Sequence, residues 1–160
     1  MIDWLVLFGF GVAAMAAAST GAAFPPGDWY KALNKPAWTP PNWLFPVAWT
    51  ALYIGIVIAA WRMALSDHPL APLAIAAWSA QIALNAVWSP VFFGLRSLGG
   101  AMGVLVALWL AVAATLVVAS YVDGTAALLF VPYLVWVSYA GALNFAIWRG
   151  NPEHKPLSAV

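Results

Sequence analysis

The chain contains no cysteine and very few charged side chains. Asp, Glu, Lys and Arg make up only 7% of its 160 residues, and the formal net charge is +1. The lack of cysteine excludes disulfides, iron–sulfur ligation and thiol catalysis, and the near-zero net charge excludes the basic footprint of a nucleic-acid-binding protein. A soluble domain carries about a quarter charged residues. With 65% hydrophobic residues and a mean hydropathy of +0.90, the composition predicts an integral membrane protein in contact with the lipid bilayer.

Five long apolar segments account for most of the chain. Each approaches or exceeds the ~20 residues that a helix needs to cross the hydrocarbon layer, and Pro, Gly, Ser and Asp mark the breaks between them. The period-2 alternation of membrane strands does not occur. We therefore expect one domain over 1–160, an all-α bundle of five transmembrane helices. The segments are 4–23, 44–61, 73–93, 98–121 and 126–148, with a long ordered loop over 24–43 and a C-terminal tail over 149–160.

Ionisable side chains are missing from the middle of all five segments. Such groups mark proton relays and ion-coupled transport, so their absence argues against a pump or a proton-coupled exporter. It also argues against acid–base catalysis within the membrane. His68 and His154 both lie in predicted loops, so no residue is expected to ligate a metal or a buried haem iron.

The basic residues predict the orientation. The leading Met1-Ile2-Asp3 carries no Lys or Arg and the apolar run after it is too long for a signal peptide, so the first segment is expected to be a retained span. Arg62 then lies alone on one side of the membrane. The positive-inside rule places the N-terminus outside, and the first loop and C-terminus in the cytoplasm. The cations that share the cytoplasmic side are Lys31, Lys35, Arg96, Arg149 and Lys155.

Neutral polar and aromatic residues recur at helical spacing in the third and fifth spans. Gln81, Asn85 and Trp88 follow i, i+4, i+7, and Trp136, Ala140 and Asn144 also share one face. Two interpretations stay open: hydrogen bonds between helices, or an aromatic pocket for a flat hydrophobic ligand. Most other tryptophans are expected to anchor span ends or face lipid. These are Trp4, Trp43, Trp61, Trp109 and Trp148.

Small residues and prolines in the spans give expectations about helix association and helix ends. Ala76-x-x-x-Ala80 and the small-residue run of the first span favour a homodimer through spans three and one, over the glycines of span four; packing within one bundle is the alternative. Pro46 and Pro132 are expected near helix N-termini, where proline costs little. Pro90 is expected to kink or end span three.

Three strings resemble the translocator protein family, also called tryptophan-rich sensory proteins or peripheral benzodiazepine receptors. They are "WYKALNKPAWTPPNWLFPVAWTALY" (29–53), "QIALNAVWSPVFFG" (81–94) and "FVPYLVWVSYAGALNFAIWR" (130–149). The resemblance covers nearly the whole chain and implies a five-helix bundle, usually a homodimer. It also implies binding of porphyrins such as protoporphyrin IX, of sterols in animals, and of synthetic drugs.

The resemblance also implies a set of ligand-binding residues. Trp29 and Trp136 match tryptophans implicated in light-dependent porphyrin breakdown, so they are the candidate catalytic residues. Phe145 replaces the tyrosine of the animal sterol motif, a weak motif, which argues against sterol affinity and favours a bacterial membrane. The implied ligand-binding residues are Trp29, Tyr30, Trp38, Trp49, Tyr53, Asn85, Trp88, Trp136, Ala140, Leu143 and Asn144.

The leading hypothesis is a membrane receptor or facilitator for porphyrin-like ligands, with a role in tetrapyrrole transport or stress sensing and no obligatory cofactor. One alternative is an enzyme that degrades porphyrin in light, and another is a dimeric scaffold that ligand modulates. The loop 24–43 is expected to act as a lid, stiffened by its prolines. Lys31 or Lys35 could meet ligand carboxylates, although topology signalling also explains both lysines.

Overall fold

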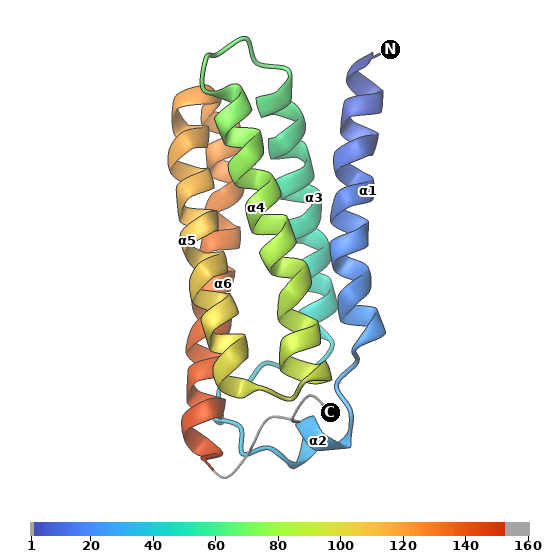
Figure 1. Cartoon of the computed structure of the whole chain (residues 1–160), viewed down its shortest axis with the longest axis vertical. Helices are drawn as coiled ribbons and strands as arrows, with labels where there is room; N and C mark the ends of the chain where they lie inside the picture. The colour runs from blue at the N-terminus through green and yellow to red at the C-terminus, as the bar shows by residue number, and fades with distance from the viewer. Residues whose placement is uncertain (1, 153–160) are drawn as a thin grey trace.

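The computed structural model describes residues 2–152, which form five long helices, one short helix and one π-helical turn (Figure 1). His154 and Lys155 lie outside the described residues. The elements are α1 (Ile2–Ala23), α2 (Asp28–Ala32), α3 (Leu44–Ala64), α4 (Ala71–Ser89), η1 (Pro90–Gly94), α5 (Leu98–Val122) and α6 (Gly124–Gly150).

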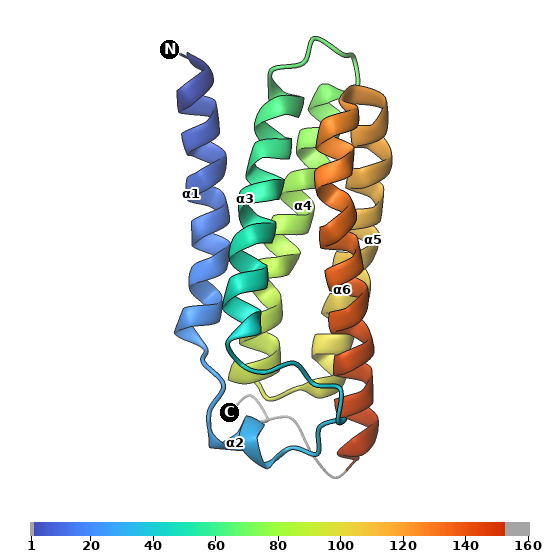
Figure 2. The ribbon, with the colours of Figure 1, turned by 180° about the vertical axis from the view of Figure 1, so that it is seen from behind.

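The five long helices confirm the expected all-α membrane bundle. All five, with α4 and η1 taken together, are long and apolar enough to span a bilayer. They run up and down side by side in both views (Figures 1 and 2). The predicted break at Asp123 is also confirmed, because Asp123 ends α5 and its carboxylate accepts a hydrogen bond from the backbone N–H of Ala126 in the first turn of α6. Such side-chain capping satisfies a donor that the helix itself leaves unpaired.

Two prolines test the expectations about helix ends. Pro90 ends the α-helical pattern of α4 as predicted, and the following turn is π-helical, with the Leu95 N–H donating to the Pro90 carbonyl at 2.8 Å. The expectation for Pro132 is wrong. Because α6 begins at Gly124, Pro132 lies inside the helix, where its missing N–H removes one helical hydrogen bond. Hydropathy placed the helix start within two residues, at 126, and Pro132 lies inside the helix from either start.

The connections gather at two ends of the bundle. The N-terminal end of α1 and the α3–α4 connection lie at one end, and α2, the α4–α5 connection and the end of α6 lie at the other (Figures 1 and 2). We refer to the second as the loop end. The loop end therefore carries Lys31, Lys35, Arg96 and Arg149, whereas Arg62 lies at the opposite end. This is the separation of basic residues that the positive-inside rule predicted. Which end faces the cytoplasm stays a prediction.

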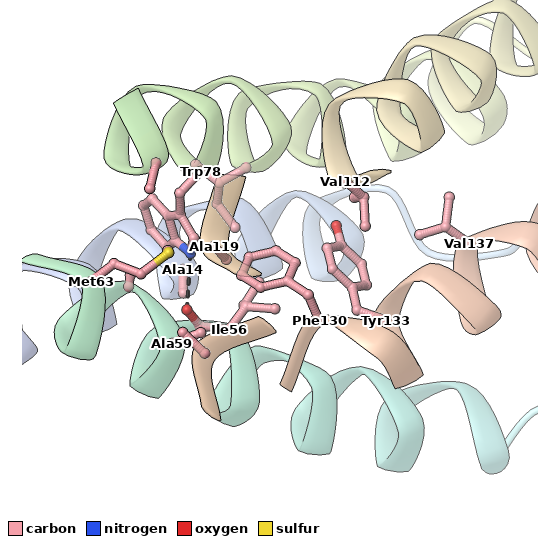
Figure 3. Packing of buried hydrophobic residues seen from close by; sticks show 14 of the residues in the cluster. Ala14, Ile56, Ala59, Met63, Trp78, Val112, Ala119, Phe130, Tyr133 and Val137 are labelled. Atoms are coloured by element: carbon pink, nitrogen blue, oxygen red, sulfur yellow. Dashed lines mark hydrogen bonds between the residues drawn. The ribbon is translucent and has the colours of Figure 1, made fainter. Parts of the chain in front are cut away.

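A continuous apolar core joins the helices away from the loop end (Figure 3). Trp78 of α4 is 2% exposed and donates its indole N–H to the Ile56 carbonyl of α3 at 2.9 Å. The Phe10 ring of α1 meets Trp78 edge to face, with centroids 4.9 Å apart. Otherwise α1 is loosely embedded: among its described side chains, only those of Ala14 and Ala17 are buried.

Candidate ligand cavity

The bundle encloses a cavity of about 510 Å³ towards its loop end. Helices α1, α3, α4, α5 and α6 all contribute to its wall, together with Tyr30 of α2 and residues of η1. Nine of the eleven predicted ligand-binding residues line it. They are Tyr30, Trp49, Tyr53, Asn85, Trp88, Trp136, Ala140, Leu143 and Asn144.

Several aromatic rings of the cavity wall pack against one another. Trp49 lies at their centre, with its ring centroid 5.7 Å from Tyr53, 6.1 Å from Tyr133 and 6.4 Å from Trp136. On the α4 side, the Trp88 ring stacks on Phe92 with centroids 4.9 Å apart. These contacts hold flat surfaces in fixed orientations, and edge-to-face pairs of this kind are worth ~1 kcal/mol beyond area burial.

A short hydrogen-bonded network crosses the cavity wall. The Tyr53 hydroxyl donates to Asn85 Oδ1 at 2.6 Å, and Asn85 Nδ2 donates to the Tyr133 hydroxyl at 2.8 Å. The network joins α3, α4 and α6, so the interpretation of Asn85 as an interhelical hydrogen-bonding residue is confirmed. Both halves of the Asn85 amide are thus engaged with protein groups.

Three other buried polar atoms on the cavity-lining residues have no hydrogen-bond partner within residues 2–152. They are Trp88 Nε1, Trp136 Nε1 and Asn144 Oδ1. Asn144 Nδ2, in contrast, donates to the Leu98 carbonyl at 3.0 Å. Buried polar groups are nearly always paired, so these two donors and one acceptor on residues of the wall are unusual. None of the residues lining the cavity is Asp, Glu, Lys, Arg or His.

The two remaining predicted residues, Trp29 and Trp38, do not line the cavity. Trp29 packs in a second apolar cluster at the loop end, with its ring 5.8 Å from Phe92 and edge to face with it. Phe92 lines the cavity, so Trp29 contacts a residue of the cavity wall without lining the cavity itself. Trp38 is 48% exposed and packs against Tyr139, whose hydroxyl donates to the Trp38 carbonyl at 2.7 Å.

The sequence model of the TspO/MBR family matches residues 4–149. The chain belongs to the TspO/MBR family. It is 53% identical over 157 residues to Protein CrtK of Rhodobacter capsulatus, with 96% of this chain and 98% of that protein covered. It is 44% identical over 150 residues to the tryptophan-rich sensory protein of Cereibacter sphaeroides, with 94% of each chain covered. The human translocator protein is 33% identical over 156 residues, covering 92% of this chain and 91% of its own.

Membership of the TspO/MBR family, together with five apolar spans, establishes an integral multi-pass membrane protein. The names of these relatives support a membrane receptor role. The expected resemblance to tryptophan-rich sensory and translocator proteins is thereby confirmed.

The first loop of this TspO/MBR protein is tied firmly to the end of α6. Asn34 and Asn151 form a reciprocal pair: Asn151 Oδ1 accepts from the Asn34 backbone N–H at 2.9 Å, and Asn151 Nδ2 donates to the Asn34 carbonyl at 2.9 Å. Leu33 is 4% exposed in the loop-end apolar cluster. Sequence reasoning missed Asn34 and Asn151, because an isolated asparagine in a loop is typical of any turn.

The two loop lysines are engaged within the loop. Lys31 pairs with Asp28 at 2.8 Å on the surface. Lys35 Nζ donates to the carbonyls of Tyr30, Lys31 and Leu33, at 2.7, 3.1 and 3.0 Å, and lies 4.8 Å from the centre of the Tyr30 ring. Lys35 therefore closes the C-terminal end of α2. Burial raises the pKa of the Tyr30 hydroxyl, a group of the cavity lining.

Proposed function

We propose that this protein is a membrane receptor that binds a porphyrin-like tetrapyrrole in the cavity between its helices. The observation that carries the proposal is the set of three buried polar atoms without partners within residues 2–152, Trp88 Nε1, Trp136 Nε1 and Asn144 Oδ1, on residues that line a mostly apolar cavity. A volume of about 510 Å³ lies within the usual range of ligand pockets, and an apolar wall with few convergent polar groups is their usual chemistry.

A free-base tetrapyrrole offers the complementary chemistry. Its peripheral carboxylates can accept from the two indole N–H groups, and a carboxyl group in its protonated form can donate to Asn144 Oδ1. Its flat apolar faces suit the rings around Trp49. Asn85 has a different task in this proposal, since both halves of its amide are already engaged. It acts as a positioning residue that orients the Tyr53 hydroxyl.

Titration with protoporphyrin IX tests the proposal. Binding should quench tryptophan fluorescence saturably in detergent-solubilised protein, and Trp136→Phe should both reduce the quenching and weaken the affinity, because it removes one indole from the wall and one donor. Trp4→Phe is the matched control, since Trp4 is 69% exposed and stacks on Trp61 outside the cavity. Absence of saturation, or equal effects of the two variants, would contradict the proposal.

Light-dependent breakdown of the bound porphyrin is a second candidate, favoured by the indole of Trp136 in the cavity wall. Because Trp29 lies behind Phe92, a reaction of this kind should depend more on Trp136 than on Trp29. Illuminating the complex and following porphyrin absorbance in Trp136→Phe and Trp29→Phe separates the two residues. A decay rate equal to that of the protein-free porphyrin would restrict the function to binding.

We also propose that two copies associate through the outer face of α4. Ala76 and Ala80 are both exposed on this helix, and small residues allow close helix contact in a bilayer. The small residues of α5 form a less continuous face, because Gly99 is already covered: a Cβ there would lie 3.1 Å from the Trp148 ring, although Gly103 is exposed and open. Crosslinking yields from cysteines introduced at Ala76 and at Gly103 should differ, with Ala76 giving the dimer.

A further inference from the structure

The wall of the cavity is not equally thick on all sides. Along α4, α5 and α6 the lining residues are mostly buried, as for Asn85, Leu108 and Asn144. Along the C-terminal half of α1 and the N-terminal half of α3, several residues that line the cavity are exposed rather than buried. These are Ala18, Gly21, Ala22, Pro46 and Thr50.

The first loop covers the loop end of the cavity in part, since Pro26 and Asn42 line the cavity and are themselves exposed, but this loop is held in place by several contacts. The reciprocal Asn34–Asn151 pair and the hydrogen bond from Tyr139 to Trp38 fasten the first loop across the bundle to α6. Leu33 anchors the same loop by burial among apolar residues of η1, α5 and α6. Entry from the aqueous side through this end would break several of these contacts at once.

The contacts of α1 explain why the opening lies on its α3 side. At the far end, the Trp61 indole donates to the Asp3 carbonyl at 2.9 Å, which fastens α1 to α3 there. Near the loop end, α1 and the residue that follows it pack against α4 and η1 instead. A Cβ on Gly21 would lie 3.8 Å from Ser89 Oγ, and the Phe24 ring packs against Gly94. Figures 1 and 2 show α1 as an outer helix beside α3 and α4.

The side chains at this opening are small. On α1 they are alanine and glycine, and on α3 the Thr50 hydroxyl is turned back to the Pro46 carbonyl at 2.7 Å. None of these rim side chains is bulky or charged, so they would not obstruct a hydrophobic molecule that arrives from the lipid. Because α1 and α3 are both membrane spans, the opening faces the hydrocarbon layer.

We propose that ligand enters and leaves the cavity sideways, from the hydrocarbon layer of the membrane, through a portal between α1 and α3 rimmed by Ala18, Ala22, Pro46 and Thr50. The proposal rests on the proposed binding of a flat hydrophobic ligand in the cavity. It makes the bilayer the phase from which this protein collects its ligand, and it leaves the first loop as a fixed cover.

Site-specific blocking tests the portal, because the natural chain contains no cysteine. Single variants Thr50→Cys and Ala22→Cys place a thiol on each rim, and a bulky maleimide is then attached in lipid nanodiscs. Val47→Cys is the matched control, since Val47 is on the same helix, is 58% exposed and does not line the cavity. Stopped-flow fluorescence measures how fast protoporphyrin IX binds and, in competition, how fast it leaves.

Labelling either rim residue should slow both association and dissociation by about tenfold or more relative to the same variant unlabelled, since a barrier on the route of entry and exit alters the two rates together. Labelled Val47→Cys should keep the unlabelled rates. Unchanged rates at both rims, or a loss of affinity with an unchanged association rate, would overturn the portal while the binding proposal stands.

A maleimide attached to the first loop tests the alternative, that ligand enters through the loop end. Trp43 is 65% exposed in the loop and does not line the cavity. If labelled Trp43→Cys binds slowly while the two labelled rim variants bind at their unlabelled rates, ligand enters through the loop end and the portal is wrong. Absence of saturable quenching in the unlabelled natural chain would instead overturn the binding proposal, and the portal with it.

Discussion

Two amides one helical turn apart on α4 should respond oppositely to removal. Gln81 is completely buried, and neither its Oε1 nor its Nε2 has a hydrogen-bond partner within residues 2–152. Asn85, in contrast, accepts from Tyr53 and donates to Tyr133. The sequence pattern treats the two as equivalent members of one polar stripe, and the structure separates them.

The magnitudes follow from these contacts. Leaving a buried amide unpaired costs about 1–3 kcal/mol, so Gln81→Met, which keeps the length of the side chain, should raise the free energy of unfolding by about 1–2 kcal/mol. Asn85→Leu removes both hydrogen bonds and strands the Tyr133 hydroxyl, which is 0% exposed. Because the Tyr53 hydroxyl still faces the cavity, most of the loss comes from Tyr133, and the expected decrease is about 2 kcal/mol.

Reversible unfolding in mixed detergent micelles, followed by far-UV circular dichroism over an SDS titration, measures both changes on one scale. The unmodified protein serves as reference, and Ser79→Ala as control, since Ser79 is exposed on the same helix. The reasoning would be refuted if Gln81→Met destabilised the bundle, or if the two variants shifted stability in the same direction.

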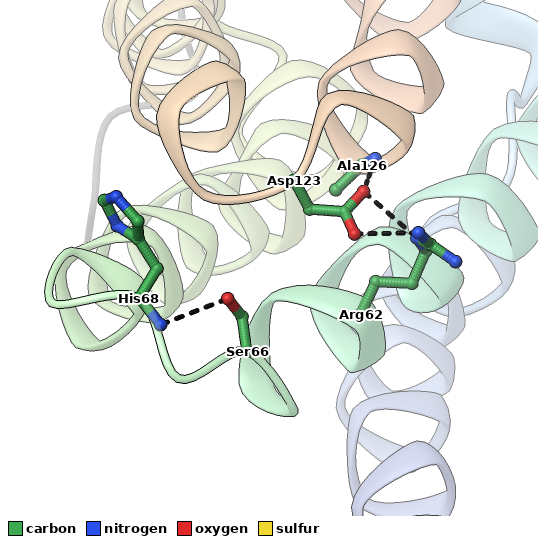
Figure 4. Close-up of polar contacts among 5 residues, drawn as sticks. All are labelled: Arg62, Ser66, His68, Asp123 and Ala126. Atoms are coloured by element: carbon green, nitrogen blue, oxygen red, sulfur yellow. Dashed lines mark hydrogen bonds and ion pairs between the residues drawn. The ribbon is translucent and has the colours of Figure 1, made fainter.

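Three further expectations concern the cavity, the far end and the loop. Ala140→Leu should weaken protoporphyrin IX binding by about tenfold or more, because overpacking costs about 1–3 kcal/mol, whereas Ala142→Leu on the outer surface should leave the titration unchanged; equal affinities would refute the placement of Ala140. The Arg62 guanidinium, which donates to Asp123 at 3.1 and 2.8 Å (Figure 4), lowers the pKa of that carboxyl. Since the folded-state pKa lies below the unfolded value of about 4, the pair stabilises above that pH and loses its effect as pH falls through the lowered pKa. Unfolding midpoints of the unmodified protein and Arg62→Gln should therefore converge on acidification, and a constant difference would contradict the assignment. Asn151→Ala should speed amide exchange at Leu33 and Asn34 by tenfold or more, because it removes two hydrogen bonds between loop and α6 worth about 1 kcal/mol each, and it should leave exchange in α5 unchanged; unaltered loop exchange would mean that other contacts hold the cover.

The expected lid behaviour of the first loop is tested by the same exchange measurement. If protoporphyrin IX protects residues 29–43 strongly, the loop moves with ligand as the sequence suggests. The reciprocal Asn34–Asn151 contacts favour small protection there, and larger protection along the portal faces of α1 and α3.

Hydropathy and turn chemistry, both local properties, were sufficient to predict five spans, their order and the break at Asp123. Helix spacing and the family strings were sufficient to predict nine residues of the cavity wall. Which polar atoms of that wall are paired depends on neighbours that are distant in sequence: Tyr53 and Tyr133 engage Asn85, Leu98 engages only half of Asn144, and Phe92 separates Trp29 from the cavity. The proposed portal between α1 and α3 depends likewise on which helices α1 packs against. Periodicity determines which face of each helix is apolar, and only the packing of one helix against another decides which atoms on that face stay open to a ligand.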